Sequence, residues 1–216
     1  MLKVSDTVRE ILENSETAVE AMRSGVLNLR AFARQIQPLV EAKTLKPVKM
    51  GTIVVALSRI GSSVKGIEQL VPNITLSELS IKSPLCDITY EKTGESVRLA
   101  HSFSNKLGDL NGHFFTMTQG IKEITFIISD DLRDKLLNHF PGNPKAIFQD
   151  LVGLNVSFSE DYLAHPNVIY AILSRLAIKR INVIEIVSTY TELMIVVEKK
   201  EMESAIAQLN GLFKKI

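Results

Sequence analysis

Few residues of this sequence have the types and spacing that acid–base or metal chemistry requires. The histidines stand singly on different segments, and no His-x-x-x-His or Cys-x-x-Cys pair offers the ligand spacing of a metal site. Asp130 and Asp131 begin a helical pattern, where carboxylates more commonly cap a helix than catalyse a reaction. The sequence contains neither a GxxxxGK[ST] phosphate loop nor a GxSxG nucleophile turn. These patterns predict no catalytic residue, no metal site and no cofactor.

The composition is that of a globular protein from a reducing compartment. The 216 residues are 45% hydrophobic and 23% charged, with a formal net charge of +1. The single cysteine, Cys86, excludes an internal disulfide framework. No segment approaches the roughly 18 apolar residues of a membrane span, and the charged first residues do not suit a signal peptide. We therefore predict a cytoplasmic protein that does not associate with a membrane.

The first 66 residues predict a small helical module. Three amphipathic patterns follow one another over residues 5–24, 28–44 and 48–61, with apolar side chains at three-and-four spacing. Asn28 is a good cap for the second helix, and Pro38 is expected to end or bend that helix. The segment is also basic, because residues 1–65 hold ten Lys and Arg against six Asp and Glu.

Two interpretations of this module remain open. A helix, a short link and a helix are typical of a helix-turn-helix, in which the third pattern would be the recognition helix. Residues 28–61 would then contact DNA through the cations of the link and of the outer face of that helix, namely Lys43, Lys46, Lys49 and Arg59. That face has few of the Arg, Asn and Gln side chains that read base edges. A helical packing or dimerisation module is the alternative.

The rest of the chain repeats one order of elements. Residues 67–150 predict strand, helix, strand, strand, helix and strand, with Pro84 separating two initial strands and a hairpin turn at Gln119–Gly120. Residues 151–216 repeat this order about 70–75 residues later, with a helix at 165–180 and antiparallel strands after it. The order is that of ferredoxin-like βαββαβ units. We predict an α+β protein with three parts: a helical, helix-turn-helix-like module (1–66) and two such units (67–150 and 151–216).

The segment "HPNVIYAILSRLAIKRINVIEIVSTYTELMIVVEKKEMESAIAQLNGLF" resembles the last ACT domain of aspartate kinases. His165-Pro166, Ile181-Asn182-Val183, Ser188-Thr189 and the helical pattern at 201–213 stand where that family has corresponding turns, strand starts and helix. The resemblance covers about 60 residues and extends by element order to residues 74–150. It implies two ACT-type units, in which the final strand of one unit can come from a part of the chain outside that unit's own helices and strands.

The resemblance also implies a function and a site. ACT units typically bind an amino acid where two units meet, and a helix N-terminus there can receive the ligand carboxylate. Carried over to this chain, the ligand-binding residues are His165, Pro166, Asn167, Val168, Ile169, Asn182 and Val183. The family has Gly where Asn167 stands, and Asn tolerates the left-handed backbone that such a turn needs.

The kinase lobe of that family would need a few hundred further residues, so the resemblance concerns only its regulatory part. We predict a non-catalytic, allosteric regulatory protein, homodimeric and responsive to an amino acid or a similar carboxylate ligand. A transcriptional regulator, whose helical module binds DNA under control of the ACT pair, is the alternative, and an adaptor for a separate enzyme is a third possibility.

Overall fold

The computed structural model describes residues 2–63, 71–108 and 112–213, which fall into two compact units, Met1–Pro72 and Asn73–Ile216. No helix in these ranges is long and apolar enough to cross a membrane. The predicted boundary between residues 66 and 67 lies outside the described residues. The division into three ranges stays a prediction.

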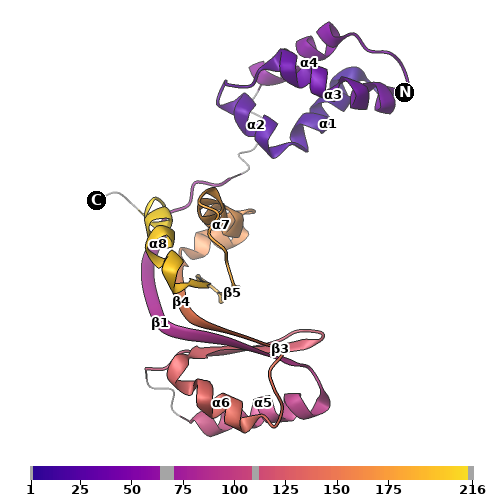
Figure 1. Ribbon diagram of the computed structural model, residues 1–216. Helices are drawn as coiled ribbons and strands as arrows, with labels where there is room; N and C mark the ends of the chain where they lie inside the picture. The colour runs from indigo at the N-terminus through magenta and orange to yellow at the C-terminus, as the bar shows by residue number, and fades with distance from the viewer. Residues whose placement is uncertain (1, 64–70, 109–111, 214–216) are drawn as a thin grey trace. The chain divides into compact units, whose positions relative to one another are not determined.

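Within its described residues, the first unit contains four helices where three were predicted: α1 (Val4–Glu13), α2 (Glu16–Arg23), α3 (Leu29–Thr44) and α4 (Met50–Ser62) (Figure 1). The first pattern is interrupted at Asn14, whose side-chain amide donates to the carbonyl of Glu10 at 2.9 Å and so competes with the helical bonds. Gly25 follows α2 with a left-handed φ of 72°. Asn28 caps α3 as predicted, because its Oδ1 accepts from the N–H of Ala31 at 3.0 Å. Pro38 does not end α3.

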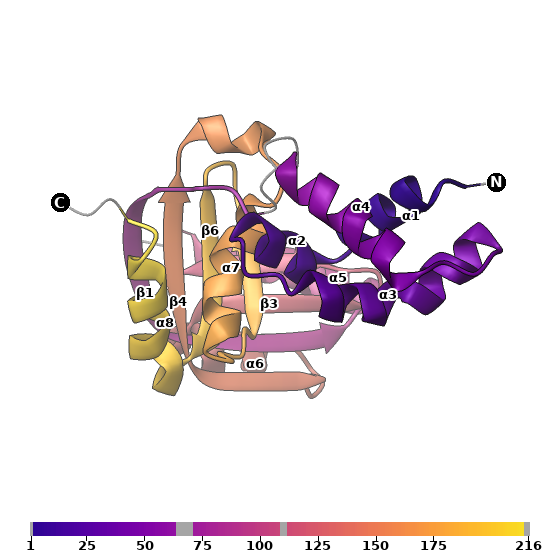
Figure 2. The ribbon, with the colours of Figure 1, turned by 90° about the horizontal axis from the view of Figure 1, so that it is seen from above.

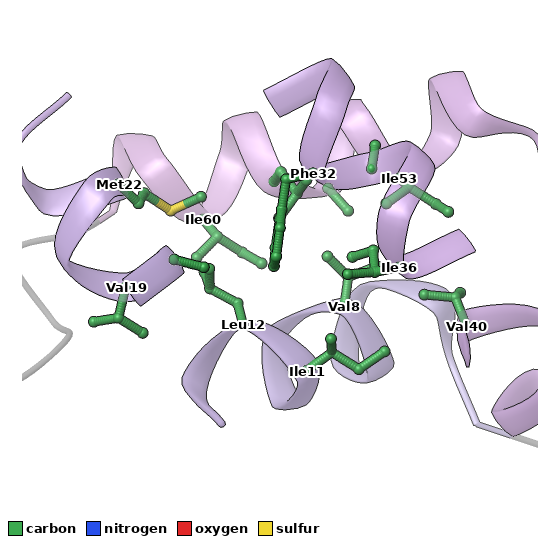
Figure 3. Packing of buried hydrophobic residues seen from close by; sticks show 14 of the residues in the cluster. Val8, Ile11, Leu12, Val19, Met22, Phe32, Ile36, Val40, Ile53 and Ile60 are labelled. Atoms are coloured by element: carbon green, nitrogen blue, oxygen red, sulfur yellow. The ribbon is translucent and has the colours of Figure 1, made fainter. Parts of the chain in front are cut away.

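The predicted apolar stripes of this unit meet in a single core (Figure 3). Val8 and Leu12 of α1, Phe32 and Ile36 of α3, and Ile53 of α4 are 8% exposed or less. Figure 3 shows these side chains pointing toward one another from three helices. Burial of several large aliphatic side chains stabilises a module of this size at roughly 1.5–3 kcal/mol each. A helix-turn-helix character of the unit stays a prediction.

The second unit is built on one six-stranded antiparallel sheet in the order β2-β3-β1-β4-β6-β5. The strands are β1 (Leu76–Glu91), β2 (Phe115–Gln119), β3 (Glu123–Ser129), β4 (Ala146–Phe158), β5 (Glu185–Ser188) and β6 (Glu192–Glu198). Pro84 does not divide β1, contrary to the prediction, since the strand continues through a cis Ser83–Pro84 bond with a register shift between Lys82 and Leu85. The hairpin of β2 and β3 is confirmed.

The two long central strands belong to both halves of the sheet. The order β2-β3-β1-β4 is the ferredoxin-like order of one unit, and β5-β6-β4-β1 is the same order for the second. In the second half, the start of β1 takes the place of the last strand, so that this strand comes from outside the run of residues 151–216. The predicted boundary after residue 150 falls inside β4. The α+β class is confirmed.

Helices cover the two halves separately (Figure 1). Helix α5 (Gly94–Leu107) and helix α6 (Arg133–His139) lie on the half that contains β3, whereas α7 (Val168–Ile178) and α8 (Met202–Asn210) lie on the other half (Figures 1 and 2). Short 3-10 turns occupy Asp130–Leu132, Glu160–Ala164 and Lys199–Glu201. Cys86, Ile88 and Phe126 face α5 and α6 in one buried cluster.

The opposite faces of the two halves form a second core, because the sheet is curled. Successive side chains of a strand point to opposite faces, so Leu85 of β1 and Ile127 of β3 face away from α5 and α6. They join Leu151 of β4 and Met194 and Val196 of β6 in a buried cluster. The curl therefore brings side chains of both halves into one apolar joint, which we call the central joint.

A candidate ligand pocket at the start of helix α7

A pocket of about 430 Å³ lies between the start of α7, the 3-10 turn before it and the turn that joins β5 to β6. This volume is within the range of small-molecule sites. Its lining comprises Phe158, Tyr162, Leu163, His165, Asn167, Val168, Ile169, Tyr170, Ser188, Thr189, Tyr190 and Leu193. Four of the seven predicted ligand-binding residues therefore lie together in one pocket.

The helix predicted at 165–180 begins three residues later, at Val168. The cause is the His165-Pro166-Asn167 turn. His165 is extended (φ −95°, ψ 127°), as a residue before proline prefers, and Asn167 is left-handed (φ 67°, ψ 17°). His165 is also held by its ring, because Nδ1 donates to the carbonyl of Asp161 at 2.7 Å.

The first residues of α7, Val168 and Ile169, follow this turn and line the pocket, so the N-terminus of the helix lies at the pocket. The first intrahelical bond is donated by Ala171 to the carbonyl of Asn167 at 2.9 Å. Within the described part of the chain, the N–H groups of Val168 and Ile169 meet no acceptor. A helix N-terminus of this kind carries a partial positive charge and favours an anion.

The remaining walls are polar on one side and apolar on the other. Ser188 and Thr189 supply hydroxyl groups, and the turn is closed by a bond from the Thr189 N–H to the carbonyl of Glu192 at 3.0 Å. Phe158 and the buried Leu193 form the apolar wall. No Lys, Arg, Asp or Glu side chain is among the described residues that line the pocket.

The other three predicted residues are placed elsewhere. Pro166 lies in the turn but does not line the pocket. Asn182 and Val183 follow the C-terminal end of α7, which at 11 residues is about 16 Å long. One chain therefore does not bring them to His165. Sequence reasoning missed the aromatic lining, Phe158, Tyr162, Tyr170 and Tyr190; only the Ser188-Thr189 turn gave a signal for this wall.

The predicted DNA-contacting residues differ in whether an acid pairs with them. Lys43 forms an ion pair with Glu10, Nζ to Oε1 at 2.6 Å. Lys46 and Lys49 are exposed in the link between α3 and α4, and Arg59 is exposed on α4. Two further exposed cations, Arg30 and Arg34 on α3, were missed because nothing in the helical pattern distinguished them from solvent-facing charges.

The other reactive side chains serve packing. Burial is the main cause that raises the pKa of the Cys86 thiol to about 12, so it stays a neutral thiol. His139 Nε2 lies 2.7 Å from Ser102 Oγ and 3.1 Å from the carbonyl of Leu99, which ties α6 to α5. Among the described residues, no three His, Cys, Asp or Glu side chains are grouped as a metal site would require.

Comparison with solved structures identifies the fold of the second unit. The regulatory subunit of aspartate kinase from Thermus thermophilus aligns with a TM-score of 0.53 over 66% of this chain and all of that subunit, at 12% identity. Clostridium acetobutylicum aspartate kinase aligns with a TM-score of 0.54 and 18% identity over 65% of this chain and 35% of its own length. A structure of aspartokinase alpha and beta subunits aligns with a TM-score of 0.51 and 13% identity over 64% of this chain and 98% of its own length.

The structural neighbours are thus regulatory ACT-domain subunits of aspartate kinases, which this chain matches over about 65% of its length and nearly all of theirs. At these identities the likeness concerns the fold. No protein-family model matches the sequence. No curated protein matches it either.

Proposed function

We propose that this protein is a non-catalytic, cytoplasmic regulatory protein that senses an amino acid or a similar small carboxylate through its paired ACT-like units. The observation that carries this proposal is the pocket where His165, Asn167 and the first N–H groups of α7 face the Ser188-Thr189 turn. The fold shared with aspartate kinase regulatory subunits supports a regulatory, ligand-sensing role.

The lining favours one class of ligand. A carboxylate would accept from the N–H groups of Val168 and Ile169, where the helix dipole favours negative charge. Its polar or ammonium group would meet the hydroxyls of Ser188 and Thr189. Since no Lys, Arg, Asp or Glu side chain lines the pocket among the described residues, and since Phe158 is apolar, an amino acid with an uncharged side chain fits better than lysine or aspartate.

The homodimer is proposed from the same half of the sheet. Strand β5 lies at the edge, where its outer backbone groups are open to another strand. Helix α7 exposes the apolar side chains Ile169 (47%), Tyr170 (39%) and Ile178 (69%). Exposed apolar side chains near an open sheet edge are typical of a surface that a second copy covers.

A two-fold axis at this edge would bring the remaining predicted ligand-binding residues, Asn182 and Val183, of one copy to the pocket of the other. Antiparallel pairing of two β5 strands places the start of one beside the end of the other. Asn182 and Val183 precede the start of β5, and Ser188, at its end, lines the pocket. We therefore propose that Asn182 and Val183 of a second copy complete the pocket. Ligand would act by binding one arrangement of the two copies more tightly than another.

A thermal-shift screen of the twenty amino acids tests the sensing function. At least one should raise the melting temperature, because a ligand at 100 times its Kd adds about 2.7 kcal/mol to the free energy of unfolding. Ser188→Trp, which fills the pocket, should abolish the shift, and Asn182→Ala should reduce it. Asn73→Ala, at an exposed asparagine outside the pocket, should leave it unchanged. No shift from any of the twenty would contradict the proposal.

Light scattering after size-exclusion chromatography tests the dimer. Ile178→Glu puts a charge in place of the most exposed of these apolar side chains, and burying that charge opposes association, so the variant should elute as a monomer. Ile121 is 95% exposed at the turn between β2 and β3, and Ile121→Glu is the matched control that should remain dimeric. A monomeric native protein, or equal behaviour of both variants, would contradict pairing through α7 and β5.

A second candidate function is a DNA-binding transcriptional regulator controlled by the ACT-like pair. One observation favours it: a group of exposed cations of the helical module forms no ion pair over residues 2–63, namely Arg30, Arg34, Lys46, Lys49 and Arg59. Three of its acids, Glu10, Glu13 and Glu20, pair with Lys43, Arg9 and Arg23 respectively. Nine Lys and Arg stand against six Asp and Glu over these residues, so the module carries a net positive charge.

A further inference from the structure

We infer that the helical module binds duplex DNA through one basic surface, made of Arg30, Arg34, Lys46 and Lys49, which positions helix α4 in the major groove. This inference rests on the second candidate function and specifies its surface and ligand. It replaces the predicted set that included Lys43, because Lys43 is bound to Glu10 at 2.6 Å. We call these four residues the basic surface.

The spacing along α3 places two of the cations on one face. Arg30, Arg34, Gln37 and Glu41 are separated by four, three and four residues, so their side chains follow one stripe of the helix. Gln37 and Glu41 identify what this stripe faces. Gln37 Nε2 donates to the carbonyl of Val48 at 2.9 Å, and Glu41 Oε1 accepts from the N–H of Val48 at 2.9 Å. The stripe therefore runs toward the link between α3 and α4.

The link supplies the other two cations. Val48 is 6% exposed and anchors the link between the two side chains of α3, while Lys46 and Lys49 on either side of it are exposed. Leu45 begins the link with a left-handed backbone (φ 55°), which reverses the chain after α3. Because Val48 is bonded on both its backbone groups, the two lysines are held near the stripe that carries Arg34 and Arg30.

Helix α4 starts at this surface and exposes small side chains. Gly51, Thr52, Val55, Ser58 and Arg59 are solvent-exposed, whereas Ile53, Leu57 and Ile60 are buried. Most of this face lines a pocket that α4 shares with the start of α1, where Val4, Ser5, Asp6 and Arg9 form the other wall. Thr and Ser hydroxyls bind base edges, a Val methyl can contact thymine, and Arg recognises guanine.

The arrangement matches the way a helix-turn-helix meets DNA. There the second helix enters the major groove with its N-terminal residues at the bases, while the first helix crosses the backbone. Arg30 and Arg34 would then contact phosphates from α3, and Lys46 and Lys49 would contact phosphates beside the start of α4. The major groove of an RNA duplex is too deep and narrow to admit a helix, so duplex DNA is the better fit.

The test uses the full chain and a fluorescein-labelled, mixed-sequence DNA duplex of about 24 base pairs, with anisotropy measured between 50 and 300 mM NaCl. Four phosphate contacts predict a slope of log K against log salt concentration of about −3.6, from about −0.9 per contact. Arg34→Ala and Lys49→Ala should each weaken binding and lower the steepness of the slope by about 0.9. Lys43→Ala is the matched control, and its slope should equal that of the native chain.

Three results would overturn the inference. These are absence of binding at 50 mM NaCl, unchanged slopes for both Arg34→Ala and Lys49→Ala, and equal affinity for an RNA duplex of the same sequence. The replaced side chains are exposed, so melting curves of the variants should match that of the native chain and exclude misfolding as the cause of a loss. The amino-acid screen does not depend on this surface, and a failure here leaves that proposal standing.

Discussion

Asp87→Asn should raise the free energy of unfolding at pH 7.5 by about 3 kcal/mol and leave it almost unchanged near pH 3. Asp87 lies in β1 with only 4% of its surface exposed, on the face that forms the central joint. The gain arises because asparagine has nearly the same shape but no charge to desolvate. Chemical denaturation at a series of pH values measures this difference.

The physical cause is the environment of the carboxyl group. Burial, aided by the nearby carboxylate of Glu185 on β5, raises the pKa of Asp87 from 3.8 to about 6. The hydroxyl of Thr89 donates a hydrogen bond to the carboxylate at 3.4 Å and so opposes this rise of the pKa. Thr89 is itself 2.8 Å from the hydroxyl of Thr125, so the donor is shared within a small polar group.

The sign of the pH dependence follows from the raised pKa. Between about pH 4 and pH 6 the unfolded chain releases the proton of Asp87 while the folded chain still holds it. The contribution of Asp87 to stability therefore falls as pH rises through this window and is constant above it. The difference between Asp87→Asn and the native chain should grow over the same window. Glu78→Gln, an exposed acid on the same strand, is the control. A difference that is flat from pH 3 to pH 8 would contradict this account.

Gly153→Val should lower the free energy of unfolding by about 3 kcal/mol, the upper part of the range for overpacked cores. Gly153 lies in β4 where the strand passes the central joint. A Cβ atom there would lie 2.9 Å from Met194 Sδ and 3.0 Å from Leu85 Cδ1, closer than packed atoms tolerate. Both neighbours are buried in the cluster that joins the two halves of the sheet, so neither has free space to occupy.

Urea denaturation of Gly153→Val and Gly153→Ala measures this effect, and the alanine variant should be less affected. Gly94→Ala is the control. Gly94 begins α5 and has no atom within 4 Å of an added Cβ. Its replacement by alanine should be neutral or slightly stabilising. Equal stability of Gly153→Val and the native chain would mean that the two halves do not pack as tightly at the central joint as described.

Hydrophobic spacing was sufficient to predict the class of the second unit. The apolar runs of β3 and β6 and the three-and-four spacing in α5 and α7 carry the βαββαβ order. The continuity of β1 and β4 through both halves was not predictable in the same way. Pro84 is a local signal for a strand end, and only the pairing of β1 with β4 on both sides of it overrides that signal.

The site was predictable in part for a similar reason. His165, Asn167, Val168 and Ile169 are neighbours in sequence, so one turn keeps them together. Asn182 is separated from them by the length of α7, so within one chain it lies away from the pocket. In the helical module, Lys43 and Lys49 are equally plausible cations by sequence. Only the packing of α1 against α3 shows that Glu10 neutralises Lys43.

The proposed function requires that a carboxylate ligand bind at the first N–H groups of α7. Amide proton–nitrogen NMR spectra of the native chain, titrated with the amino acid that gives the largest thermal shift, measure this binding. We expect the amide signals of Val168 and Ile169 to move downfield and to saturate together with those of Ser188 and Thr189, and we expect Ser188→Trp to abolish the changes. Saturable shifts confined to other parts of the chain, with Val168 and Ile169 unmoved, would contradict it.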